Sequence, residues 1–457
     1  MASRTSPTSP STTRGTTASA AACRSEPPDF ESLPLEEGVA LHLHRAERYK
    51  TVRLEVFLQD LLQRRRNTRL ALLSRLLERG THRLPDLRSL NRHADQLWGA
   101  NLSVDIDQLG DRQVLHLVLE VLDERYVPAG EDPLEPGIVL LGEVLSDPVT
   151  QDGGFRPDYL HQEKRALRQS IAATFNDKML YAQRRCVEEM CRGEAYGLPL
   201  LGDPADFRGI SAVNLLRYHR HLLQTNPIDV FASGWFDDRR VAELTARSLA
   251  GRRRYAPIPA TVPIPVAAPE RPRRILERQE VSQGRLVQGY RTQTGLADPD
   301  YPALGLLNLL WGGDSQSRLF RTLREERGLC YHVGSYLEPL CGLLFVTAGV
   351  EAADFEAAIG GIADQLEALR AGRFEPGEVE AARSLLRHRL LRLEDDRAGL
   401  ARLHYRQRVA ASSHGRRELG RAVDAVTPEA LCRVAQRVKL DTTYFLHNGQ
   451  SASGRWD

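Results

Sequence analysis

The 457-residue sequence lacks several features that would assign it to a function class. No run of apolar residues is long enough to cross a bilayer, so a soluble protein without a membrane partner is expected. Its six cysteines include no C-x-x-C pair, which fits reduced thiols in a cytoplasmic protein better than a disulfide framework. The 62 basic and 60 acidic residues nearly cancel to a net charge of +2, which argues against a dedicated nucleic-acid binder.

Motifs of common enzyme classes are also missing. The chain has no G-x-S-x-G, P-loop or dinucleotide fingerprint. Neither H-x-x-E-H nor H-E-x-x-H, the usual helical zinc motifs, occurs among its 13 histidines. His42 and His44 share one face of a predicted strand, whereas His219 and His221 diverge on a predicted helix. Without a third ligand nearby, both pairs are interpreted as exposed residues that bind no metal.

Hydrophobic residues make up 42% of the sequence, enough to form the cores of two large domains or more in a chain of this length. Residues 1–35 are predicted to be a disordered tail, because their first part is rich in Ser, Thr and Pro and has no acidic residue before Glu26. An organellar transit peptide is the alternative, which the prolines disfavour. Closely spaced prolines predict an extended linker at 251–275, and residues 451–457 form a second tail.

The segments on either side of the linker, 36–250 and 276–450, show the same order of predicted elements. Three landmarks recur at offsets of 219, 216 and 215 residues: Phe155 and Phe374, Ser211 and Thr427, and Gly234 and Gly449. So constant a spacing predicts an internal duplication. The expected fold class is α+β, with two related α/β halves that each hold an antiparallel-rich sheet flanked by helices.

Apolar periodicity predicts the individual elements of both halves. Strands are expected at 38–48, 52–59, 102–107, 113–121, 228–234, 285–292, 331–337 and 342–350. Helices are expected at 70–79, 86–98, 133–147, 157–192, 212–223, 301–311, 316–327 and 354–371. Asp86 and Ser211 are suitable N-cap residues for two of these helices.

The stretch 317–331, SRLFRTLREERGLCY, is the first candidate for a functional site. Four arginines recur at every third position and predict a basic helix face: Arg318, Arg321, Arg324 and Arg327. Such a face is usually only solvated. However, Arg324 lies in the last turn of the helix and Tyr331 opens the next strand. A guanidinium and a phenol that converge at this junction suit the carbonyl or carboxylate of a peptide.

This stretch resembles the second-half signature of the pitrilysin/insulinase (inverzincin) peptidase family, which includes mitochondrial processing peptidase. In that family an Arg and a Tyr seven positions apart help hold the substrate, a role that the resemblance assigns to Arg324 and Tyr331. The Gly-rich approach to this helix is kept only at Gly312 and Gly313. The resemblance covers residues 36–450 and implies two related α/β halves joined by a linker, in a metallopeptidase-like fold.

The stretch 70–85, LALLSRLLERGTHRLP, corresponds to the helix that holds the metal in active members of the family. Those members carry H-x-x-E-H there and a further Glu on a later helix. The resemblance places four other residues at the metal and base positions: Ala71, Ser74, Arg75 and Ser170. No ligand or general base remains, and the guanidinium of Arg75 would repel a dication.

The resemblance therefore implies a non-catalytic subunit of a zinc peptidase pair. It is similar to the bacterial zinc-less partner subunits that are linked to elongation factor P modification and peptide processing. An active H-x-x-E-H homologue would hold the zinc, and this chain, with no cofactor of its own, would contribute Arg324 and Tyr331 to a peptide-binding chamber. Two alternatives remain open: a non-enzymatic scaffold subunit, and a metallopeptidase with an unconventional metal site.

Overall fold

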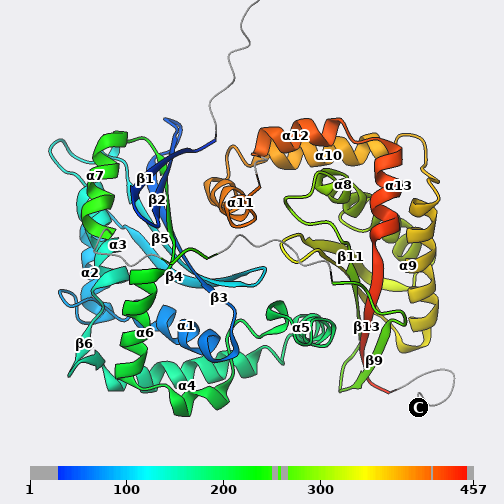
Figure 1. The fold of residues 1–457 in the computed structure, drawn as a ribbon, viewed down its shortest axis with the longest axis horizontal. Coiled ribbons are helices and arrows are strands. Elements are labelled where there is room, and N and C mark those ends of the chain that lie inside the picture. Colours follow the sequence, from blue (N-terminus) through cyan, green and yellow to red (C-terminus); the bar gives the residue numbers. More distant parts are fainter. Residues whose placement is uncertain (1–28, 250–255, 259–265, 413–414, 450–457) are drawn as a thin grey trace, which may run out of the picture.

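The fold comes from a computed structural model that describes residues 29–249, 256–258, 266–412 and 415–449. These residues form two halves side by side, each built from one large sheet with helices packed against it (Figure 1). The predicted tails at 1–28 and 451–457, and most of the predicted linker, lie outside the described residues. None of the described helices is long and apolar enough to span a bilayer.

The first half is built on a six-stranded sheet with the order β1-β2-β8-β3-β5-β4. Its strands are β1 Glu31–Glu36, β2 Val39–Arg45, β3 Thr51–Leu61, β4 Asn101–Leu109, β5 Arg112–Leu122 and β8 Ile228–Gly234. Only β2 and β8 run parallel to each other. The prediction of a tail as far as residue 35 was wrong at its end, because β1 pairs with β2 and packs Leu33 and Leu35 against the core.

The second half is built on a five-stranded sheet with the order β11-β12-β10-β13-β9. Its strands are β9 Arg273–Arg278, β10 Gly284–Arg291, β11 Cys330–Glu338, β12 Leu343–Val350 and β13 Lys439–His447. Strand β9 begins inside the stretch predicted as linker, so that boundary was wrong by three residues. Because β9 is a short edge strand with exposed arginines at both ends, it carries little of the alternation that marks a strand.

The two sheets repeat one topology. The strands β4-β5-β3-β8-β2 correspond in order and direction to β11-β12-β10-β13-β9, including the single parallel pair at the end of each series. The helices before β8 and β13 also begin alike, since the hydroxyls of Ser211 and Thr427 each accept the backbone N–H three residues on. The structure thus confirms an α+β fold of two duplicated halves, to which β1 is an addition.

The helices follow a similar order in both halves, except that α12 is extra in the second half and α7, which follows β8, is extra in the first. Those of the first are α1 Arg64–Leu77, α2 Leu87–Gln96, α3 Leu134–Ser146, α4 Pro157–Ala173, α5 Lys178–Met190, α6 Ala212–Thr225 and α7 Asp238–Leu249. Those of the second are α8 Tyr301–Trp311, the π-helical η4 Phe320–Glu326, α9 Phe355–Arg370, α10 Glu378–Arg392, α11 Arg397–Val409, α12 Arg416–Asp424 and α13 Pro428–Arg437. The single helix predicted at 157–192 is two, because the carboxylate of Asp177 caps a new helix by accepting from Met179 and Leu180 N–H.

Each half lends one helix to the sheet of the other half (Figure 1). Helix α5 of the first half buries Cys186 and Met190 in a cluster with Phe345 of the second sheet. Helix α11 of the second half packs on the first sheet, where the rings of Tyr405 and Phe57 stack with centroids 4.4 Å apart. Because α5 and α11 occupy equivalent places in the duplicated order, the contact between the halves is reciprocal.

Two histidines that the sequence suggested were exposed, His42 and His219, are buried. His42 on β2 is fully buried and bonds Asp229 through Nε2 at 3.0 Å and Ser32 through Nδ1 at 2.7 Å. Its ring lies 5.3 Å from that of His404 on α11. His219 is buried as well. The prediction of exposure was wrong because it rested on local pattern alone, whereas the cover over His42 comes from a helix some 360 residues along the chain.

The histidines between α11 and the first sheet should make stability depend on pH. Burial lowers the pKa of His404 to about 4, and the nearby His42 and Arg408 act in the same direction against Asp229 and Asp29. The unfolded chain, with an ordinary value of 6.5, therefore binds more protons between pH 4 and 6.5. Stability is fully present above that window and is lost as the pH falls through it.

Replacing His404 by Gln should reduce the fall in the free energy of unfolding between pH 7.5 and pH 5 by about 1–2 kcal/mol. Denaturant titration at the two pH values measures this difference. The exposed His221→Gln is the matched control and should keep the wild-type pH dependence. An unchanged pH dependence in His404→Gln would show that this contact is not a source of acid sensitivity.

Candidate functional site

Helix α1, which carries the degenerate metal positions, is a core helix of the first half. Its leucines at 70, 73 and 77 are fully buried, and so is Ala71, while the hydroxyl of Ser74 donates to the carbonyl of Ala71. The turn after the helix needs its glycine, because a Cβ on Gly80 would lie 2.4 Å from the carbonyl oxygen of Leu84. The helix and turn predicted from the sequence are thus present, and Ala71 and Ser74 are packed into the core of the first half.

The structure brings Arg75 and Ser170 together across 95 residues of sequence. An Nη2–H of Arg75 donates to the hydroxyl oxygen of Ser170 at 2.8 Å, and Nη1 lies 3.7 Å from a carboxylate oxygen of Glu163. Glu163 is buried and is held more closely by Arg79, with Nε 2.6 Å from Oε1. A guanidinium therefore occupies the space between α1 and α4, at the positions that the resemblance gave to a metal.

Sequence reasoning missed two carboxylates of this site. Glu163 precedes Ser170 by seven residues, about two helical turns, and this same-face spacing could have identified it. Glu78 follows α1 and accepts the N–H of Val104 on the edge strand β4 at 3.0 Å. Burial raises the pKa of Glu78, and the neighbouring Asp105 and Glu163 add to this. In the described part of the chain no three His, Cys, Asp or Glu side chains form a group that could hold a metal ion.

The second predicted site, Arg324 and Tyr331, is brought together as expected. The guanidinium carbon of Arg324 lies 4.5 Å from the ring centroid of Phe320 and 5.7 Å from that of Tyr331. Tyr331 is 77% exposed, and Arg324 is exposed beside it. Among the residues that the structure describes, Arg324 has no carboxylate partner. A cation and a phenol are therefore both open to a ligand.

Arg324 and its three neighbouring arginines do not form the one basic face that was predicted. The segment η4 is π-helical, with the N–H of Arg327 bonded to the carbonyl of Thr322 five residues back, so a three-residue repeat spreads around it. Arg318 is buried against Glu378 with Nε 3.1 Å from the carboxylate. π-Helical turns occur frequently at functional sites, and this one presents Arg324 to solvent.

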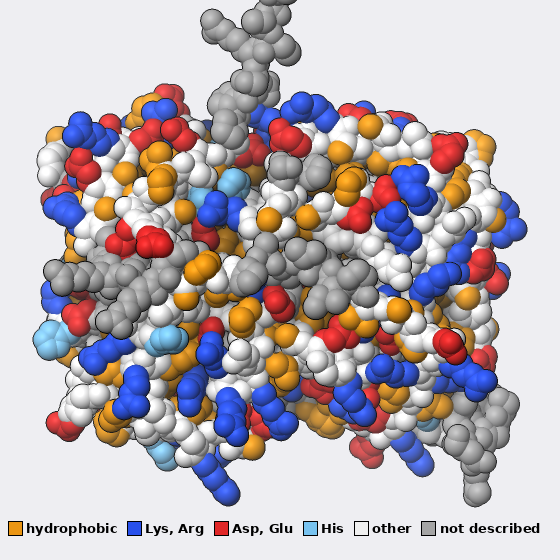
Figure 2. Space-filling view, in the orientation of Figure 1, with side chains coloured by type: hydrophobic (Ala, Val, Ile, Leu, Met, Phe, Trp, Pro, Cys, Tyr) orange, Lys and Arg blue, Asp and Glu red, His pale blue; other side chains and the backbone are white. Residues whose placement is uncertain are grey.

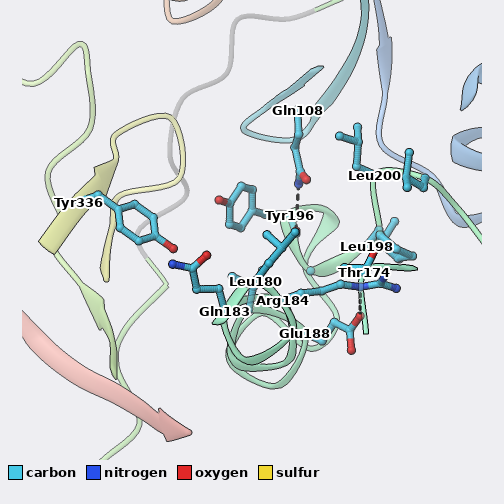
Figure 3. Close-up of a pocket in the computed structure, with 14 residues that line it drawn as sticks. Gln108, Thr174, Leu180, Gln183, Arg184, Glu188, Tyr196, Leu198, Leu200 and Tyr336 are labelled. Carbon is cyan, nitrogen blue, oxygen red and sulfur yellow. Dashed lines mark hydrogen bonds and ion pairs between the residues drawn. The ribbon is translucent and has the colours of Figure 1, made fainter. Parts of the chain in front are cut away.

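A pocket of about 330 Å³ opens between the halves, one helical turn from Ser170 (Figure 3). Thr174, which follows α4, lines it and donates to the carbonyl of Ser170. Its apolar walls come from α5 and from the loop that follows: Leu180, Val187, Leu198, Pro199, Leu200 and Leu201. Its polar groups come from α5, the same loop and the edge strands of both sheets: Gln183, Tyr196, Gln108 and Tyr336.

The pocket is uncharged apart from one ion pair. Arg184 and Glu188 neutralise each other at 2.8 Å. The hydroxyls of Tyr196 and Tyr336 and the amide of Gln183 point into the pocket (Figure 3), and none has a hydrogen-bond partner among the described residues. Burial raises the pKa of both phenols, so they stay neutral. Apolar walls with a few free neutral polar groups suit an uncharged apolar ligand with amide groups.

Comparison with known proteins identifies the family to which this chain belongs. A model described as "Peptidase M16 inactive domain" matches residues 209–386. The "Probable inactive metalloprotease YmfF" of Bacillus subtilis is 32% identical over 418 residues, which cover 91% of this chain and 97% of that protein. The chain belongs to the peptidase M16 family. This finding confirms the pitrilysin/insulinase resemblance and identifies an inactive M16 homologue.

Solved M16-like structures share the whole fold. A conserved protein from Enterococcus faecalis superposes with a TM-score of 0.84 at 24% identity, over 92% of this chain and 98% of that one. A peptidase M16 inactive domain from Pseudomonas fluorescens gives 0.74 at 17% identity, over 93% and 100%. At these identities the likeness concerns the fold, which extends across both halves.

The ion pair of Arg79 and Glu163, which lies beside the degenerate M16 metal positions, should contribute to stability. Arg79→Ala should lower the free energy of unfolding by about 2–4 kcal/mol, because the buried carboxylate of Glu163 loses its close partner. Arg321→Ala is the matched control, since Arg321 pairs with Glu375 at the surface and should cost less than about 1 kcal/mol. Denaturant unfolding compares the two, and equal losses would show that the Glu163 pair has no special weight.

Proposed function

We propose that this chain is a non-catalytic subunit of a cytoplasmic zinc peptidase pair, in which an active H-x-x-E-H homologue holds the metal. One observation carries the proposal: Arg324 and Tyr331 stay paired and exposed while Arg75 fills the chain's own metal frame. Arg324 and Tyr331 are exposed, and Arg324 has no carboxylate partner in the described part of the chain. They therefore contribute little to the stability of the fold and are available to bind a ligand.

In such a pair the partner's zinc would supply the activated water that attacks a peptide bond. This chain's contribution would be to bind and orient the peptide. The guanidinium of Arg324 can donate two parallel hydrogen bonds to a peptide carboxylate or one to a carbonyl, and the Tyr331 hydroxyl can donate another. The neutral pocket between the halves would hold an apolar side chain of the same peptide.

A non-enzymatic scaffold is the second candidate. The reciprocal packing of α5 and α11 joins the halves through two apolar clusters, and a scaffold needs no more than such a joined body. The third reading, a peptidase with an unconventional metal site, finds no support in the described residues, where no suitable ligand group occurs.

Metal analysis and co-purification test the pairing. The purified chain should contain no stoichiometric zinc, because its frame holds Arg75 and buried apolar side chains. Affinity purification from its own cell should recover an M16 homologue with an intact H-x-x-E-H motif, and zinc should accompany that protein. One zinc per chain in the isolated subunit would overturn the proposal.

Arg324→Ala should lower kcat/KM of the reconstituted pair for peptide cleavage by about tenfold or more without removing zinc, because a charge-assisted contact to the peptide is lost. Tyr331→Phe should have a smaller effect in the same direction. Arg327→Ala, an exposed arginine at the end of the same segment, is the control and should keep full activity. A scaffold would be indifferent to all three substitutions.

A further inference from the structure

Arg75 has more hydrogen-bonding capacity than its surroundings use. A guanidinium offers five N–H donors, yet within the described part of the chain Arg75 makes one hydrogen bond, to the hydroxyl of Ser170. Its contact with Glu163 is long at 3.7 Å, because that carboxylate already binds Arg79 at 2.6 Å. The side chain is also 31% exposed, so a ligand can reach it.

Helix α4 connects Arg75 to the neutral pocket. Ser170, which Arg75 binds, stands four residues before Thr174 on α4, and Thr174 lines the pocket. Four residues of helix rise about 6 Å, roughly the distance from the carboxylate of an amino acid to the end of a leucine side chain. A group bound in the pocket could therefore extend a carboxylate to Arg75.

Helix α1, which carries Arg75, is basic, and Glu163, the carboxylate nearest to Arg75, is already held by Arg79. Helix α1 contains five arginines and no acidic residue, and α6 contains two arginines and no acidic residue. Figure 2 shows Lys and Arg side chains along the lower edge of the first half, where Figure 1 places α1, α4 and α6. A surface potential of one sign attracts ligands of the opposite sign.

We propose that Arg75 and the pocket together bind the C-terminus of a peptide that ends in an apolar residue. Arg75 receives the terminal carboxylate, and the walls formed by Leu180, Leu198 and their neighbours receive the terminal side chain. The proposal rests on the proposed function in that the space between the halves takes peptide. It adds that the position of a metal in active M16 peptidases is, in this chain, a receptor for a finished C-terminus.

Direct binding tests the carboxylate. The probes are N-acetyl-Ala-Ala-Leu as the free acid and the same peptide as its C-terminal amide, titrated into the full chain at pH 7.5 and followed by calorimetry or ligand-observed NMR. The acid should bind about 10- to 100-fold more tightly, as expected for hydrogen bonds to a charged group. In Arg75→Gln this preference should fall to within about twofold, while binding of the amide stays unchanged.

Matched variants separate the local effect from charge and folding. Arg64→Gln removes the same charge from the same helix at a 76% exposed side chain, and should keep the preference for the acid. Arg75→Lys keeps the charge without the fork and should give an intermediate preference. It also provides a folded variant if Arg75→Gln is unstable.

The side-chain pocket is tested in the same assay. N-Acetyl-Ala-Ala-Gly as the free acid should bind about tenfold or more weakly than the leucine peptide. Leu180→Trp should fill the pocket and weaken both leucine peptides, whereas Val213→Trp, which adds the same ring at a 48% exposed site on α6, should not.

Three results would overturn the proposal: acid and amide bind equally, the preference survives Arg75→Gln, or neither peptide binds. Failure here is distinguishable from failure of the subunit role. If a zinc-bearing homologue is recovered but the chain shows no preference for free C-termini, only the proposed carboxylate site is refuted. If the chain prefers free C-termini but no homologue co-purifies with it, only the proposed pairing is refuted.

Discussion

The exchange of helices between the halves is the contact on which the rest of the structure depends. Helix α5 lies on the second sheet and α11 on the first, each with an apolar face against the other half's strands. The same contact forms the site, because α5 presents a different face to the pocket, where Leu180 and Gln183 lie. The position of the neutral pocket is therefore fixed by the burial that joins the halves, at about 25 cal/mol for each Å² of apolar surface removed from water.

The degenerate metal frame shows how a fold keeps a catalytic scaffold after losing its chemistry. Two helices, α1 and α4, converge with Arg75, Arg79 and the buried carboxylate of Glu163 between them. Such a carboxylate needs a cation, since an unpaired charge in this position would be costly. In this chain guanidinium groups meet that need. The helix packing can therefore persist without zinc, and one of the two guanidinium groups retains free donors.

Much of the fold followed from the sequence because its signals are local. Asp86 and Ser211 cap helices as expected, and both accept the backbone N–H three residues on. The metal-frame alignment was also sufficient to predict that Arg75 and Ser170 occupy related positions. What failed depended on distant partners: β1 and β9 become strands only by pairing, and His42 is buried only by α11. The π-helical winding of η4 could not be predicted from the three-residue arginine repeat, which suggested one face of a regular helix.

The hydrogen bond between Glu78 and Val104 determines how a guest chain can approach the first sheet. Strand β4 is the sheet's open edge, where another polypeptide could ordinarily be added as a further strand. The carboxylate of the half-buried Glu78 already accepts the N–H of Val104, so an incoming strand would have to displace this carboxylate. Lateral growth of the sheet at this point is thereby discouraged. At the proposed C-terminal site a guest would instead enter end-first, led by its terminus and its last side chain.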